Sequence, residues 1–159
     1  MNFDVNLINP FLGATKSVLG TAANLNISIG KPTVKKTEFS KQSLLITLGI
    51  TGQVEGQVIM DIPETSAVKI ASAFMQTMMG MTVESLDEMS ISAISELGNQ
   101  IMGNAATIFS TQNTLIDITP PTLIRGEVTF SRDYALNIAV PIIYENETLF
   151  ELNMAVKSK

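Results

Sequence analysis

The chain has 159 residues, of which 45% are apolar and 16% charged. This composition fits one globular domain with its own core and excludes a disordered chain. The chain has no histidine and no cysteine, which excludes disulfides, Ser-His-Asp and Cys-His catalysis, and metal sites built from imidazoles or thiolates. A net charge of −5 with scattered lysines and arginines argues against nucleic acid as a partner, and no apolar run approaches the roughly 18 residues that cross a membrane.

The first half of the chain alternates helical and extended patterns. Pro10 fits the first turn of a helix, and Pro32 marks an edge segment because it has no N–H to donate to a neighbouring strand. Gly80 follows directly after a helical apolar stripe and predicts where that helix ends. The expected elements are a helix over 6–24, an extended segment over 26–37, strands over 43–51 and 54–62, and a helix over 63–79.

The second half predicts the same order of elements again. Pro120-Pro121 cannot continue a helix and introduces a strand, and Glu145-Asn146-Glu147 reads as the turn of a hairpin. The expected elements are a long helix over 86–110, a strand over 122–130, and strands over 134–144 and 148–156.

The repeated order suggests an internal duplication within a single domain, 1–159. Gly20-Thr-Ala-Ala23 and Gly103-Asn-Ala-Ala106 occupy matching late positions in the first and the long helix. We therefore expect a pseudo-repeat of residues 6–62 and 86–156, joined by the helix over 63–79.

These elements predict an α+β fold. Two α-β-β-β units would form a six-stranded, mostly antiparallel sheet with the long helices packed on one face. The other face would be either solvated or used in association. The terminal hairpin, 134–156, would offer an edge for pairing with a second copy, so we expect a homodimer.

The long helix carries an unusual exposed stripe. At 100° per residue, Glu96, Asn99 and Gly103 fall within about 60° of one another, with Ser92 on the same stripe. Gly98 points toward the apolar side, where we expect it to pack against the sheet. The stripe therefore predicts a surface that receives another molecule closely. The opposite, apolar face consists of Ile94, Leu97, Ile101, Ala105 and Ile108.

The segment Ser95-Glu-Leu-Gly-Asn-Gln-Ile-Met-Gly-Asn-Ala-Ala-Thr107 resembles the CheC/CheX/FliY family of bacterial chemotaxis phosphatases. The specific part is the Glu-x-x-Asn core with its flanking glycines, and the order of elements along the whole chain is similar to the CheC-like fold. The single motif is most similar to the CheX layout. Gly13 and Lys16 stand at the matching positions of the first helix, so we expect one active site per chain.

The resemblance implies hydrolysis of the aspartyl phosphate on a response-regulator receiver domain, typically CheY. It implies that Asn99 positions the attacking water and that Glu96 pairs with a lysine of the receiver. Magnesium would belong to the receiver, so we expect no cofactor or metal of the chain's own. Ser92, Gly103 and Asn104 are expected to contact the partner, Ser92 through a hydrogen bond at the rim and Gly103 by leaving room for the partner's backbone.

The same pattern allows other interpretations. The same helix would also suit a non-catalytic adaptor that binds a receiver, or a dimerisation module that retains the pattern as a relic. Met75, Met78, Met79 and Met81 are expected to fill the core or a mobile helix end, with a flexible binding surface as the alternative. The first residues lack the pattern of a secretory signal, so we expect a cytoplasmic protein.

Overall fold

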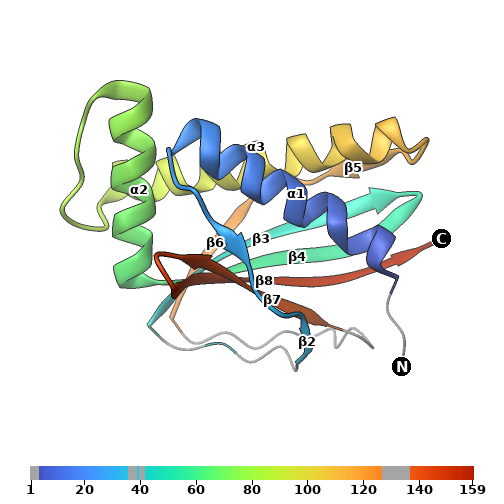
Figure 1. Ribbon diagram of the computed structural model, residues 1–159. Helices are drawn as coiled ribbons and strands as arrows, with labels where there is room; N and C mark the ends of the chain where they lie inside the picture. Colours follow the sequence, from blue (N-terminus) through green and yellow to red (C-terminus); the bar gives the residue numbers. More distant parts are fainter. Residues whose placement is uncertain (1–3, 36–38, 40–41, 127–136) are drawn as a thin grey trace.

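The computed structural model describes residues 4–35, 39, 42–126 and 137–159 (Figure 1). Within these residues the elements are α1 (Val5–Ala22), β1 (Ser28–Ile29), β2 (Thr33–Val34), β3 (Ser43–Gly52), β4 (Val54–Pro63), α2 (Glu64–Met79), α3 (Glu88–Thr111), β5 (Ile116–Ile118), β6 (Thr122–Arg125), β7 (Ile138–Tyr144) and β8 (Glu147–Ser158). The three predicted helices and both predicted hairpins are present. Parts of the predicted strands over 122–130 and 134–144 lie outside the described residues.

All described strands join one sheet in the order β1-β7-β8-β4-β3-β5, with β2 also on β7 and β6 also on β3. Every described pairing is antiparallel. The two hairpins, β3–β4 and β7–β8, meet along β4 and β8 at the centre of the sheet. The predicted α+β fold is confirmed.

The edges of the sheet differ from the prediction. Six strands were expected, whereas eight are present among the described residues, because each edge consists of two short strands. A connection containing Pro32 separates β1 from β2, and one containing Pro120 and Pro121 separates β5 from β6. Proline has no N–H to donate and interrupts a ladder of backbone hydrogen bonds, so each edge is broken at its prolines.

The terminal hairpin occupies an interior position, which corrects the expectation that it forms a free edge. β7 pairs with β8 on one side and with β1 and β2 on the other, while β8 pairs with β7 and β4. The turn itself is where it was predicted. Glu145 and Asn146 connect the two strands with φ of 52° and 65°, the left-handed conformation that a two-residue hairpin turn requires.

The helices cover one face of the sheet, as predicted. α1 and α3 lie side by side across it and α2 stands at one end of them (Figure 1). Phe11 of α1 and Phe109 of α3 meet edge to face, with ring centroids 5.3 Å apart. Alternate residues of β3 face these helices and are at most 2% exposed, namely Leu44, Ile46, Leu48 and Ile50.

The helix ends show how local sequence sets their positions. α2 ends at Gly80, which has the left-handed φ of 67°. α1 begins at Val5, so Pro10 lies in its second turn and not in the first, as had been expected. Pro10 is buried there. None of the helices in the described part of the chain combines the length and the apolar character needed to cross a membrane.

The second face of the sheet was expected to be either solvated or used in association, and its centre is in fact buried within the chain and not solvated. Leu45, Ile59, Ala139 and Asn153 are at most 1% exposed. The Asn137 side-chain amide donates to the Asn153 side-chain oxygen at 3.0 Å, so part of this buried surface is polar and satisfied.

Candidate functional site

The α3 helix is anchored at its beginning. The Asp87 side chain caps it by accepting the backbone N–H of Ser90 at 2.8 Å, and this bond holds the pKa of Asp87 below its ordinary value. The buried Ser90 hydroxyl donates to the backbone carbonyls of Ser85 and Asp87. The first turn therefore has a defined position relative to the loop before it.

Gly98 brings the middle of α3 close to the sheet. A Cβ atom at this position would lie 3.3 Å from Ile46 Cγ2 and 3.5 Å from Met60 Sδ. The expectation that Gly98 is a packing glycine is confirmed. The tight packing holds α3 against the centre of the sheet, so the residues on its outer side project from a rigid support.

The outer side of α3 presents the polar residues selected from the sequence. Ser92, Glu96 and Asn99 are exposed and line one open depression of about 280 Å³, together with Ile91, Ser95 and Pro121. The opposite, apolar face is buried as predicted, except that Ile108 is half-buried.

Gly103 and Asn104 lie further along α3 and outside this depression. Gly103 is exposed, and a Cβ atom at its position would meet nothing within 4 Å. Asn104 is half-buried at the border between the two faces. The structure therefore brings Ser92, Glu96 and Asn99 together, and places open space one turn beyond them.

Glu96 and Asn99 have few internal partners. Residues three apart on a helix stand about 5–6 Å apart at their Cβ atoms, so the two head groups can reach one ligand. Glu96 Oε1 accepts one long hydrogen bond, 3.4 Å, from Gln100 Nε2. The Asn99 side chain makes no hydrogen bond to any residue in the described ranges. A carboxylate and a neutral amide are thus available side by side for an external partner.

Three lining residues of the depression were not selected from the sequence. Ile91 lies one turn before Ser95, and Ser95 lies one turn before Asn99. Helical geometry alone could therefore have indicated both residues. Pro121 belongs to the connection between β5 and β6 and reaches α3 only through the pairing of those strands with β3. No local sequence pattern could have placed it there.

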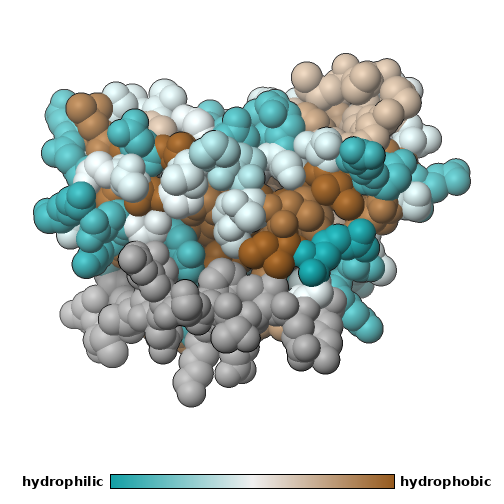
Figure 2. All heavy atoms as spheres, turned by 180° about the vertical axis from the view of Figure 1, so that it is seen from behind, coloured by the Kyte–Doolittle hydropathy of each residue, from teal (hydrophilic) through white to brown (hydrophobic). Residues whose placement is uncertain are grey.

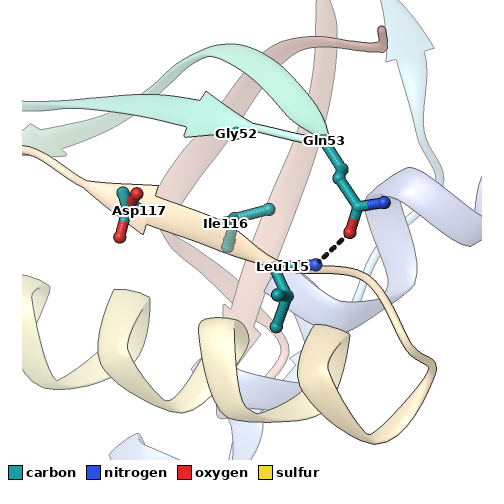
Figure 3. Close-up of a pocket in the computed structure, with 5 residues that line it drawn as sticks. All are labelled: Gly52, Gln53, Leu115, Ile116 and Asp117. Carbon is teal, nitrogen blue, oxygen red and sulfur yellow. Dashed lines mark hydrogen bonds between the residues drawn. The ribbon is translucent and has the colours of Figure 1, made fainter.

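A larger depression, of about 510 Å³, lies beyond the C-terminal end of α3 and is shown in Figure 3. It is lined by Gly52, Gln53, Leu115, Ile116 and Asp117. The Gln53 side-chain oxygen is already occupied, since it accepts the backbone N–H of Leu115 at 2.7 Å. Among its lining residues in the described part of the chain, Asp117 is the one that carries a charge.

Comparison with known proteins relates the chain to one family. The family described as chemotaxis phosphatase CheX matches residues 44–145. The CheY-P phosphatase CheX of Thermotoga maritima is 32% identical over 155 residues, covering 98% of each chain. A CheC-like superfamily protein from Shewanella sp. PV-4 has a TM-score of 0.80 at 27% identity, covering 98% of this chain and 100% of that one.

A further solved relative was captured with its partner. The CheX chain of the CheX–CheY–BeF3–Mg2+ complex from Borrelia burgdorferi has a TM-score of 0.77 and 30% identity, covering 95% of this chain and 97% of that one. The sequence match, the near-complete coverage and the shared fold all indicate the same family. The chain belongs to the CheX family of chemotaxis phosphatases.

Proposed function

We propose that this protein is a phosphatase that hydrolyses the aspartyl phosphate of a CheY-like receiver domain. The observation that carries the proposal is the pair Glu96 and Asn99, exposed side by side on the α3 helix, with one long hydrogen bond, from Gln100 to Glu96, as their only side-chain partner among the described residues. Two relatives that match nearly the whole chain support it. One is described as a CheY-P phosphatase, and the other was solved in a complex with CheY, BeF3 and Mg2+.

Asn99 would align the attacking water. In this hydrolysis the water oxygen bonds to phosphorus while the bond from phosphorus to the receiver's aspartate oxygen breaks, and the carboxylate leaves with the electron pair. An acyl phosphate is already activated, so the remaining task is to hold the water in line. The Asn99 amide offers both a donor and an acceptor and does not titrate, so a chain without histidine can perform this step.

Glu96 would set the register of docking. Its exposed carboxylate can pair with a lysine of the receiver, which would bring Asn99 to the phosphoryl group. The magnesium ion would be bound by the receiver and would stabilise charge on the phosphoryl oxygens. Ser92, Gly103 and Asn104 would contact the receiver around this centre, Gly103 by leaving space for its backbone.

The test is to phosphorylate each receiver domain of the source organism, add this protein, and follow the loss of acyl phosphate. We expect one receiver or a few to lose phosphate faster. Asn99→Ala should abolish this acceleration while binding to the receiver persists, and Glu96→Ala should weaken both. Dephosphorylation by Asn99→Ala at the wild-type rate would contradict the mechanism. Tighter binding to the phosphorylated receiver without faster decay would identify an adaptor.

The protein is further proposed to act as a homodimer in the cytoplasm, where it would meet a receiver domain. The support for a dimer is the edge formed by β1 and β2, where Val34 is 60% exposed and a second copy could extend the sheet. Sedimentation velocity measures the oligomeric state. A monomer at micromolar concentration would contradict the dimer, and a fluorescent fusion found outside the cytoplasm would contradict the proposed location.

A further inference from the structure

Methionine side chains in the described part of the chain are either fully buried or strongly exposed. Met60, Met75, Met102 and Met154 are at most 3% exposed and fill the core. The expected core filling is confirmed for Met75. Met78 and Met79 are exposed at the end of α2 and Met81 in the loop after it, so these three do not fill the core. The exposed group, which we call the methionine patch, consists of Met78 (57%), Met79 (65%), Met81 (43%) and Met89 (56%).

The methionine patch gathers at the end of α2, the loop after it and the first turn of α3. In Figure 2 a light-brown group stands out at the upper right, over the connection between α2 and α3. A depression of about 410 Å³ lies there, with Met81 and Met89 in its wall beside the buried Met75. An apolar group concentrated at one place on the surface indicates a binding function more strongly than scattered exposed residues do.

The backbone that carries the methionine patch is held in place. The Met81 N–H donates to the Met75 carbonyl at 3.3 Å, beside the left-handed Gly80. The Val83 N–H donates to the Ser72 hydroxyl at 3.2 Å. A fraying helix end would lack these bonds. The methionines therefore project from a fixed support while their own flexible side chains can adapt to a partner.

The methionine patch continues the exposed stripe of the proposed active site. Met89 stands seven residues before Glu96, which is two turns and about 10 Å along the same side of α3. From Met89 to Asn99 the rise is about 15 Å. A typical interface covers about 800 Å² on each partner, equivalent to a disc of about 16 Å radius. A receiver centred on Asn99 would therefore reach Met89, the member of the methionine patch on α3.

Carboxylates surround the methionine patch. Glu84 and Asp87 line the adjoining depression, and Glu88 is exposed in the first turn of α3. No lysine or arginine occurs between Lys69 and Arg125 in the sequence. The complementary surface would have an apolar centre and a rim of lysine or arginine side chains.

We propose that the methionine patch is a second docking contact for the receiver domain. It would receive an apolar surface with a basic rim that lies beside the receiver's phosphorylation site. The patch would supply affinity and selectivity among receivers, while Glu96 and Asn99 act at the phosphoryl group. This inference rests on the proposed function, because the receiver is taken to be the molecule that occupies α3.

The test replaces two exposed methionines by a polar residue of similar length, Met79→Gln with Met89→Gln. The probe is the receiver identified by the phosphate-decay screen, used as its BeF3–Mg2+ form for binding and in its phosphorylated form for turnover. We expect Kd and KM to rise about tenfold and kcat to stay within about twofold, since the patch contributes binding and not chemistry. Met79→Leu with Met89→Leu should stay close to wild type.

A matched control is Leu115→Gln, which changes a residue 68% exposed beyond the other end of α3 and should leave Kd and KM unchanged. Wild-type Kd and KM in the double glutamine variant would overturn the inference. So would a loss of self-association with unchanged receiver binding, which would assign the patch to a second copy of the chain. A wild-type rate in Asn99→Ala would instead contradict the proposed function.

Discussion

α1 and α3 lie side by side on the same face of the sheet, yet only one of them carries the proposed site (Figure 1). Each turns an apolar stripe toward the core. Where α3 exposes Glu96 and Asn99, the matching positions of α1 expose Gly13 and Lys16. The comparison teaches that packing requires only the buried stripes. The proposed function resides in a few exposed side chains that the fold does not need.

The largest expected effect is on the rate of dephosphorylation, which should depend on α3 but not on α1. Asn99→Ala should slow receiver dephosphorylation at least about 100-fold, because a positioned amide in an active site contributes on this scale. Lys16→Ala, at the matching exposed position of α1, should leave the rate unchanged. Both residues are exposed, so the free energy of unfolding should change by less than about 0.5 kcal/mol in either variant. Equal losses of activity would mean that α1 also contacts the receiver.

The next effect concerns how closely each helix approaches the sheet. Thr15 of α1 is fully buried and matches Gly98 of α3. Gly98→Thr should lower the free energy of unfolding by about 2 kcal/mol, since even its Cβ would lie 3.3 Å from Ile46 and the branched side chain adds two more atoms. Urea denaturation measures the change. A stability equal to wild type would show that α3 can move away from the sheet without cost.

A smaller effect distinguishes two glycines in equivalent surroundings. Gly20 and Gly103 are both exposed helical residues, and a Cβ on either would meet nothing within 4 Å. Alanine at either position should therefore stabilise the protein by about 0.5–1 kcal/mol. We expect only Gly103→Ala to raise the Kd for the receiver, because that methyl group would occupy the space proposed for the partner's backbone. An unchanged Kd in both variants would remove Gly103 from the docking surface.

The sequence predicted the elements whose signals are local. The helices and the two hairpins have strong apolar periodicity, and their boundaries were close to those observed. The exposed stripe of Ser92, Glu96 and Asn99 was predictable for the same reason, since helical geometry relates residues three or four apart. The buried position of Gly98 follows from the same geometry.

Features that depend on distant partners could not be predicted. β5 has three residues and forms only because Ile116–Ile118 pairs with the end of β3. The interior position of the terminal hairpin depends on β1 and β2, more than a hundred residues earlier, pairing with β7. Pro121 reaches the proposed site through the same kind of pairing. The proposed duplication of 6–62 and 86–156 is a statement about ancestry that remains a prediction.

The smallest expected effect concerns the caps of the two helices. Asp4 caps α1 by accepting the N–H of Asn6 at 2.9 Å, and Asp87 caps α3 by accepting that of Ser90 at 2.8 Å. The bond from Ser90 lowers the pKa of Asp87 below 3.8, the value expected for an unperturbed aspartate. Because the folded pKa is the lower one, the ionised cap stabilises the fold above pH 3.8, and this contribution is lost as the pH falls through the folded pKa.

Asp87→Asn keeps a capping oxygen and removes the charge. The variant should be less stable than wild type near neutral pH, and the difference should shrink steadily once the pH falls below 3.8. Urea denaturation of both proteins across this range measures it. A stability difference that does not change with pH would mean that the hydrogen bond alone, and not the charge of Asp87, fixes the start of the helix that carries the proposed site.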